Sequence, residues 1–134
     1  MDALLPIIGR WNTSGQVVGQ PGEIVGTDTY ELLPGIPWIA HTVDVQMPDG
    51  HVSSYELIGG AHPDGGWGMH SFDESHIPSL MRLTDEGSGV LLIHGNGVRS
   101  WLTLTAGPDH MVARWERLDG GEWVPWMQLR FDRA

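Results

Sequence analysis

Apolar and polar residues alternate along most of this chain, and such a period of two is typical of β-strands with one buried face. Short turn-forming segments rich in glycine, proline and aspartate separate the alternating runs, for example 48–50 and 95–97. No helical period extends over three turns, and a single turn or so at 2–8 is the one helical candidate. The strands predicted from this pattern span 8–18, 23–32, 37–47, 51–59, 66–73, 78–84, 89–95, 97–105, 110–118 and 122–132.

The connections between these strands are too short for crossovers, so neighbouring strands are expected to pair antiparallel. About ten consecutive strands with regular turns either split into a sandwich or close into a barrel, and closure removes the exposed sheet edges. We therefore expect an all-β fold, an antiparallel meander closed into a barrel of about eight to ten strands. A chain of 134 residues is long enough to bury its own core, so residues 1–134 are expected to form one domain.

The last predicted hairpin concentrates aromatic residues. Trp115, Trp123 and Trp126 are three of the seven tryptophans, and they flank an Asp-Gly-Gly turn that suits a tight hairpin. Indole rings bury much apolar area at a low cost in entropy, so we expect the chain to close around this hairpin and around Trp11. Pro125 cannot donate a ladder hydrogen bond, which predicts a bulge or an edge at that position.

Composition excludes several kinds of chemistry. The chain has no cysteine, which rules out disulfides and thiolate catalysis, and no lysine, which rules out Schiff-base mechanisms. Seven arginines stand against seventeen carboxylates, and the net charge of −10 disfavours nucleic acids and anionic membranes as partners. The first residues lack a basic region and a long apolar run, so a cytoplasmic location is expected.

Two stretches resemble known proteins. The segment from Gly9 to Gly15, with Trp11, is similar to the glycine-x-tryptophan start of the calycins, the superfamily of lipocalins, fatty-acid-binding proteins and nitrobindins. Residues 26–35, together with Trp-Glu-Arg at 115–117 and Trp-Val-Pro-Trp at 123–126, resemble a bacterial family of unknown function with a lipocalin-like fold. The resemblance implies a calycin-like barrel with a lumen, and it implies no established activity.

In lipocalins an arginine on a late strand packs over the tryptophan of the first strand and closes the barrel. The resemblance therefore implies that Arg117 or Arg130 covers Trp11, with Trp115 contributing to the same closure.

Sorting the predicted strands by their period of two indicates which side chains face the lumen. On 37–47 the apolar set contains His41 and Val43, so both are predicted to point inward. On 97–105 both sets carry bulky residues, and the inner set stays open. The residues expected to line a ligand pocket are Trp38, His41, Val43, Trp67, Met69 and Trp101. The apolar loop that ends at Trp38 is expected to form a lid or an oligomer contact.

Titratable groups on inward positions are candidates for acid–base catalysis, because desolvation shifts their proton affinity. The candidates are His41, Glu56, Tyr30 and His70, with Arg82 or Arg99 as possible oxyanion partners. The simpler interpretation is that these groups are hydrogen-bonded parts of the core.

Seven histidines raise the question of a metal or a haem, yet no His-x-His or His-x-x-x-His pair occurs, and no metal or other cofactor is expected. Nitrobindin-like barrels bind haem through one axial histidine, and the resemblance implies His94 or His41 for that position.

Three functions remain open at this point. The leading one is binding of a small hydrophobic or aromatic molecule in the barrel lumen. The second is an isomerase or cyclase that uses an acid–base pair in the same cavity. The third is a barrel filled by its own tryptophans that acts through its surface, for example as a homodimer.

Overall fold

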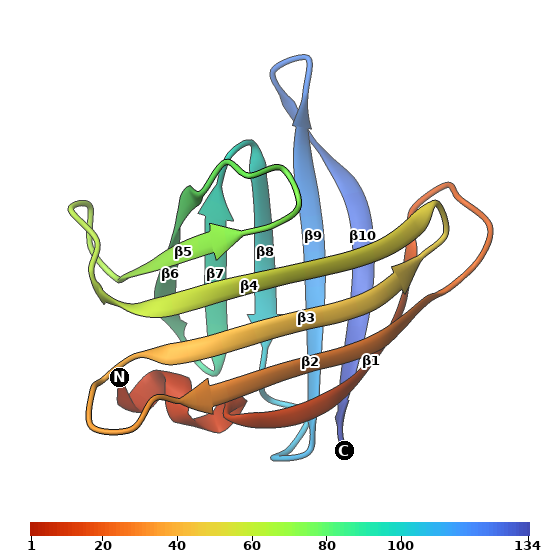
Figure 1. Cartoon of the computed structure of the whole chain (residues 1–134). Coiled ribbons are helices and arrows are strands. Elements are labelled where there is room, and N and C mark those ends of the chain that lie inside the picture. The colour runs from red at the N-terminus through yellow and green to blue at the C-terminus, as the bar shows by residue number, and fades with distance from the viewer.

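The computed structural model describes residues 1–134 as a closed barrel of ten antiparallel strands, as the alternating pattern predicts. Each strand pairs with its neighbours in sequence, and β1 pairs with β10 to close the ring (Figure 1). The elements are η1 (Asp2–Ile7), β1 (Gly9–Val17), β2 (Ile24–Leu32), β3 (Ile39–Met47), β4 (Gly50–Ala61), β5 (Trp67–Phe72), β6 (Ser79–Gly87), β7 (Val90–Gly95), β8 (Val98–Thr103), β9 (His110–Asp119) and β10 (Glu122–Arg133).

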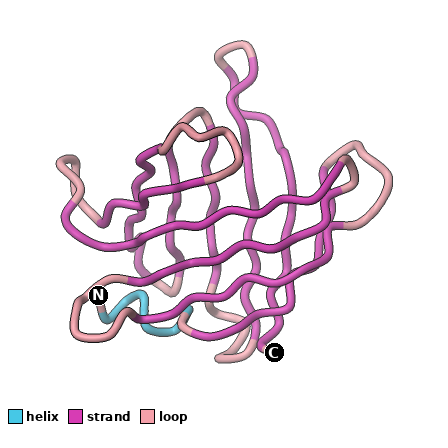
Figure 2. The backbone as a smooth tube through the Cα atoms, viewed as in Figure 1, coloured by secondary structure: helices cyan, strands magenta, loops and turns pink.

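The barrel is flattened into two groups of strands that cross. In Figure 1, β2, β3 and β4 run across the view, and β7 to β10 run steeply behind them. The short helix η1, the one helical segment in Figure 2, lies beneath one end of the barrel. The loop 73–78, which joins β5 to β6, overhangs the opposite end. No helix of the chain has the length and apolar character needed to cross a membrane.

Strand glycines and three register shifts, at 59–61, 85–87 and 125–127, allow the strands to bend. A Cβ on Gly15 would lie 2.1 Å from the backbone oxygen of Gln128, and one on Gly26 would lie 2.2 Å from the backbone oxygen of Asp44. Only glycine permits such close approaches between strands. The register of β9 and β10 shifts between Pro125 and Met127, which confirms the bulge expected from the proline.

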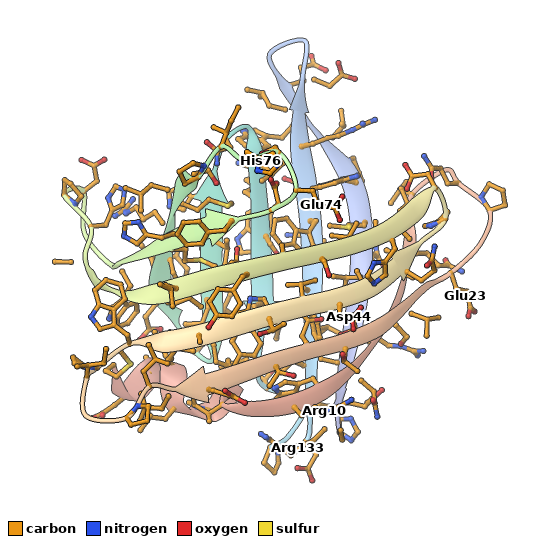
Figure 3. The ribbon with its side chains drawn as sticks, in the orientation of Figure 1. Arg10, Glu23, Asp44, Glu74, His76 and Arg133 are labelled. Carbon is orange, nitrogen blue, oxygen red and sulfur yellow. The ribbon has the colours of Figure 1, made fainter.

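Trp11 closes the end of the barrel beside η1. The indole is fully buried, and its Nε1 donates a hydrogen bond to the backbone oxygen of Ile7 at 2.9 Å. The guanidinium of Arg133 lies 4.1 Å from the centre of the indole ring and also donates to the backbone oxygen of Ile8. Leu4 of η1 is fully buried and belongs to the same hydrophobic core cluster as Trp11. Figure 3 shows Arg133 at this end of the molecule.

An arginine therefore covers Trp11, but the implied choice of Arg117 or Arg130 is wrong. The pairing of β1 with β10 places Arg133 directly opposite Trp11, whereas Arg130 stands opposite Ser14 and faces outward. Arg117 is exposed near the far end of β9. Trp115 is half-buried and packs against the main core cluster from the inner face of β9.

Burial along the inner face changes from one end of the barrel to the other. On β4 the inner positions run from Val52, which is 39% exposed, through a Glu56 side chain that is 15% exposed, to Ile58 at 1%. On β9 they run from exposed Arg117 through half-buried Trp115 to buried Met111. Along β4 and β9 the interior is therefore closely packed near η1 and more exposed at the other end, where Val17, Ile24 and Val45 of β1 to β3 form a second buried cluster.

Candidate functional site

A row of polar side chains crosses the inner face of the barrel. The strand register places Tyr30 of β2 opposite His41 of β3, His41 opposite Glu56 of β4, and Glu56 opposite Ser71 of β5. Residues directly opposite each other in neighbouring strands point to the same face. Asp28 lies two residues before Tyr30 on β2 and shares that face, so five polar groups meet on one wall.

His41 is clamped between two carboxylates. Its Nδ1 lies 2.5 Å from Oε1 of Glu56, and its Nε2 lies 2.7 Å from Oδ1 of Asp28. Because a carboxylate only accepts hydrogen bonds, both ring nitrogens must donate, and the ring is an imidazolium. The Thr13 hydroxyl donates to Asp28 Oδ2, and the Ser71 hydroxyl donates to Glu56 Oε2 at 2.8 Å.

The pKa values follow from these contacts. Burial by itself lowers the pKa of His41, but the hydrogen bonds to Asp28 and Glu56 and their charges outweigh it and raise that pKa to about 9. Burial raises the pKa of Glu56, and the hydrogen bond to His41 more than reverses this, so the pKa falls below its ordinary value. At neutral pH the row holds a positive ring between negative carboxylates.

Tyr30 completes the row as a neutral group. Its ring stacks on the His41 ring, with centroids 3.9 Å apart and an interplanar angle of 8°. Burial, followed by the charges of Asp28 and Glu56, raises the pKa of the Tyr30 phenol well above its ordinary value. The phenol therefore keeps its proton and can act only as a neutral hydrogen-bonding group or as a proton donor.

The structure brings three of the four predicted catalytic residues together and separates the fourth. His41, Glu56 and Tyr30 share the inner row, but His70 lies on the outer face of β5, 6.1 Å from the Trp38 ring. The expectation for His70 is wrong because Met69 and Ser71 on either side of it occupy the inner positions.

The two arginines considered as oxyanion partners also lie outside the lumen. Arg82 donates to the backbone oxygen of Gly65 at 2.7 Å, and Arg99 pairs with Glu116 at 2.7 Å on the outer face. Their strand neighbours Leu83 and Ser100 are buried on the inner face, so the alternation turns both arginines outward. Neither arginine reaches the row.

Of the residues expected to line a ligand pocket, Val43, Trp67 and Met69 lie on the inner face with His41, and Trp38 and Trp101 do not. Trp38 lies against the backbone of Gly59 and Gly60, just before β3. Trp101 lies on the outer face of β8, where guanidinium groups lie 4.6 and 4.9 Å from its ring.

The outward position of Trp101 also shows which face of β8, the strand predicted at 97–105, points inward. Val98, Ser100 and Leu102 form the inner set of β8, which turns Trp101 outward. Trp115 and Trp126 also contribute to the interior, and their rings meet edge to face at 5.9 Å.

The haem alternative does not fit this lumen. Both nitrogens of His41 are hydrogen-bonded to carboxylates, so neither is free to ligate iron. His94 lies on the outer face of β7, because its neighbour Ile93 is buried on the inner face. An axial histidine inside the barrel is therefore lacking at both positions.

Four polar residues of the interior were not among those predicted from the sequence: Asp28, Thr13, Ser71 and Ser100. Sorting 23–32 by a period of two places Asp28 in the same set as Ile24 and Tyr30, so the alternation indicates that Asp28 faces inward. Ser100 is fully buried, and its hydroxyl has no hydrogen-bond partner. β8 is five places from β3 in the ring of ten strands, so Ser100 belongs to the wall opposite His41.

Two hollows lie on the outer face rather than in the lumen. One of about 850 Å³ follows β1, β10, β9 and β8 and includes Arg114 and Arg130. Another of about 340 Å³ lies between Trp101 and Trp123, beside Arg99. Both are lined mainly by outward-facing side chains, so neither contains the polar row.

Comparison with known proteins bears on the fold. No family model matches the chain, and no curated protein matches it. Among solved structures, a de novo designed fluorescence-activating β-barrel is similar to it, with a TM-score of 0.56 and 18% sequence identity. The match covers 100% of this chain and 99% of the designed one. At this identity the similarity supports the barrel architecture alone.

Proposed function

We propose that this protein binds a small hydrophobic or aromatic molecule inside the barrel, between the polar row and the open end. The observation that carries the proposal is the change in burial along the inner faces of β4 and β9, from fully packed beside η1 to partly exposed around Glu56 and Trp115. Inward-facing side chains that keep solvent exposure surround space that the protein itself does not fill.

The chemistry of the lining supports an aromatic ligand. Val43, Met127, Trp115 and Trp126 supply apolar and aromatic surface near the open end. The polar row supplies a few fixed hydrogen-bonding groups on one wall, which is the usual composition of a small-molecule site. That a barrel of the same architecture was designed to activate fluorescence supports the choice of the lumen.

Acid–base catalysis, of the isomerase or cyclase type, is the second candidate, favoured by the shifted pKa values in the row. His41 has both protons held by carboxylates, so it acts as a positioning residue. Glu56 would accept a proton from a bound molecule, and the neutral Tyr30 phenol would donate one. Glu56→Gln tests the catalytic role, because it removes the base that turnover requires.

The experiment that tests lumen binding compares two tryptophan substitutions on β3. Val43→Trp fills the inner face near the open end, and Thr42→Trp places the same ring on the exposed outer face. Titration with the neutral dye Nile red should show affinity reduced at least about tenfold by Val43→Trp and unchanged by Thr42→Trp.

Native mass spectrometry of the freshly purified protein provides an independent readout. A mass that accompanies the folded chain and leaves on unfolding supports an occupied lumen. Equal dye binding by both variants, or no dye binding and no accompanying mass, contradicts the proposal and favours a barrel filled by its own side chains.

A further inference from the structure

We infer that the ligand of this lumen carries one positive charge, on a nitrogen that donates hydrogen bonds to the Glu56 carboxylate. The inference rests on the proposed lumen binding and specifies the chemical class of the ligand: a compact aromatic or aliphatic body with a single ammonium or amidinium group.

The first step is the charge count inside the barrel. Two carboxylates, Asp28 and Glu56, flank the single imidazolium of His41, which leaves one negative charge without a partner. The chain has no lysine to balance it. No arginine pairs with Asp28 or Glu56: Arg133 lies at the closed end, Arg117 takes an exposed inner position near the open end of β9, and the outer face carries Arg10, Arg82, Arg99, Arg114 and Arg130.

The second step is the cost of that charge. An uncompensated charge away from bulk water is unfavourable, and a counter-charge that reaches it restores much of what is lost. A ligand cation therefore gains more from this lumen than a neutral molecule of the same shape does. The gain is confined to the interior, because an exposed carboxylate such as Asp44 is hydrated and screened by solvent.

Of the two carboxylates, Glu56 is the one that can contact a ligand cation. Its side chain is 15% exposed, against 7% for Asp28, and it lies on the strand whose inner face opens toward solvent. Each Glu56 oxygen accepts one hydrogen bond, from His41 and from Ser71, so the carboxylate retains further acceptor capacity. A ligand N–H can use that capacity without displacing either partner.

The surroundings suit a cation in two further ways. Tyr30, Trp115 and Trp126 present aromatic rings on the interior, and ring faces attract cations. The net charge of −10 raises the local concentration of cations around the molecule. Figure 3 shows Glu74 on the loop 73–78 that overhangs the open end, so the entrance also carries an acidic side chain.

The unpaired Ser100 hydroxyl gives the opposite wall a complementary role. It is fully buried and faces inward without a partner, so a polar group at the distal end of the ligand can satisfy it. A ligand spanning from β4 to β8 would then be fixed at both ends, by charge at Glu56 and by a neutral hydrogen bond at Ser100.

The test uses three naphthalenes of one shape: 2-naphthylmethylamine, 2-naphthylmethanol and 2-naphthoate. Their affinities for the unaltered protein are measured at about pH 7 by displacement of Nile red. We expect the amine to bind at least about tenfold more tightly than the alcohol, and the carboxylate to bind most weakly. This series needs no variant, so its outcome is independent of any folding defect.

Two charge-matched variants locate the effect. Glu56→Gln should abolish the preference for the amine while leaving the affinity for the alcohol within about threefold. Asp44→Asn removes the same formal charge from the outer face, beside His51, and should keep the preference. Raising the salt to about 150 mM should leave the preference of the unaltered protein largely intact, since a buried pair is weakly screened.

The possible failures are distinguishable. Equal affinity for the amine and the alcohol overturns the charge inference but is compatible with lumen binding. The row would then be neutral, with one of its carboxylates protonated. A preference that survives Glu56→Gln places the cation elsewhere and also overturns the inference. If neither Nile red nor any naphthalene binds, the proposed function fails with it.

Discussion

The closed end and the polar row are both largely buried, but apolar packing stabilises the first and ionic hydrogen bonds hold the second together. At the closed end Trp11 and Leu4 are fully buried, with a single indole hydrogen bond and a covering arginine. In the row Asp28 and His41 are 5% and 6% exposed, yet they are charged. Burying apolar area is favourable, whereas a buried ion cluster at best recovers its desolvation cost. The first region stabilises the fold, and the second is retained at the expense of stability.

The largest effect should come from breaking the closed end. Trp11→Ala removes the central side chain of the main cluster and the platform for Arg133, and it should lower the free energy of unfolding by about 4 kcal/mol. Urea unfolding followed by circular dichroism measures this. Trp123→Ala, at a tryptophan that is 38% exposed on the rim hairpin, should cost about 1 kcal/mol or less. A smaller loss at Trp11 than at Trp123 would refute the assignment of the anchor.

The next effect should come from unbalancing the row. His41→Leu leaves Asp28 and Glu56 as unpaired buried carboxylates and should cost about 3 kcal/mol in the same urea assay. Replacing all three residues by leucine removes both the charges and their attraction, so stability should return to within about 1 kcal/mol of the unaltered protein. A triple variant as unstable as His41→Leu would mean that the row stabilises the fold in its own right.

The sequence predicts the architecture because alternation and turn chemistry are local. The ten strands, the bulge at Pro125 and the inward direction of His41 follow from neighbouring residues alone. The composition of the row depends on register across five strands, which no single strand encodes. Asp28 was therefore missed, although its partner His41 was among the candidates.

The errors have a common cause. Trp101 was placed inside because both alternating sets of its strand carry bulky residues. His70 was placed inside because it alternates with apolar residues on its strand. Alternation tells which residues share a face, but barrel closure decides which face is inner. The arginine over Trp11 was misassigned for the same reason, since only the pairing of β1 with β10 identifies Arg133.

Stability should depend on pH through the row. The pKa of His41 is raised from 6.5 to about 9, so its contribution is complete below pH 6.5 and is lost as pH rises through 9. The pKa of Glu56 is lowered from 4.5, so its contribution is present above pH 4.5 and is lost as pH falls through the lowered pKa. For these two groups stability is therefore greatest between about pH 4.5 and 6.5.

Urea midpoints at pH 5.5 and 9.5 measure this dependence. The unaltered protein should lose about 3 kcal/mol between these two pH values, and the triple leucine variant should lose much less. The facing groups are Asp28, Glu56 and Tyr30, and the Tyr30 phenol stays protonated across this range because its pKa is raised. An equal loss in both proteins would assign the dependence to groups outside the row.

The smallest effect should come from Ser100, and its sign distinguishes the two regions. Around Trp11 the buried side chains are apolar or hydrogen-bonded, so truncation there destabilises. The Ser100 hydroxyl is fully buried and unpaired, so Ser100→Ala removes a desolvated group that gains nothing and should stabilise the free protein by about 0.5–1 kcal/mol. Ser53→Ala, exposed on the outer face of β4, should change stability negligibly. If Ser100→Ala destabilises instead, its hydroxyl already has a partner in solution, and the wall opposite His41 has no free polar group to offer a ligand.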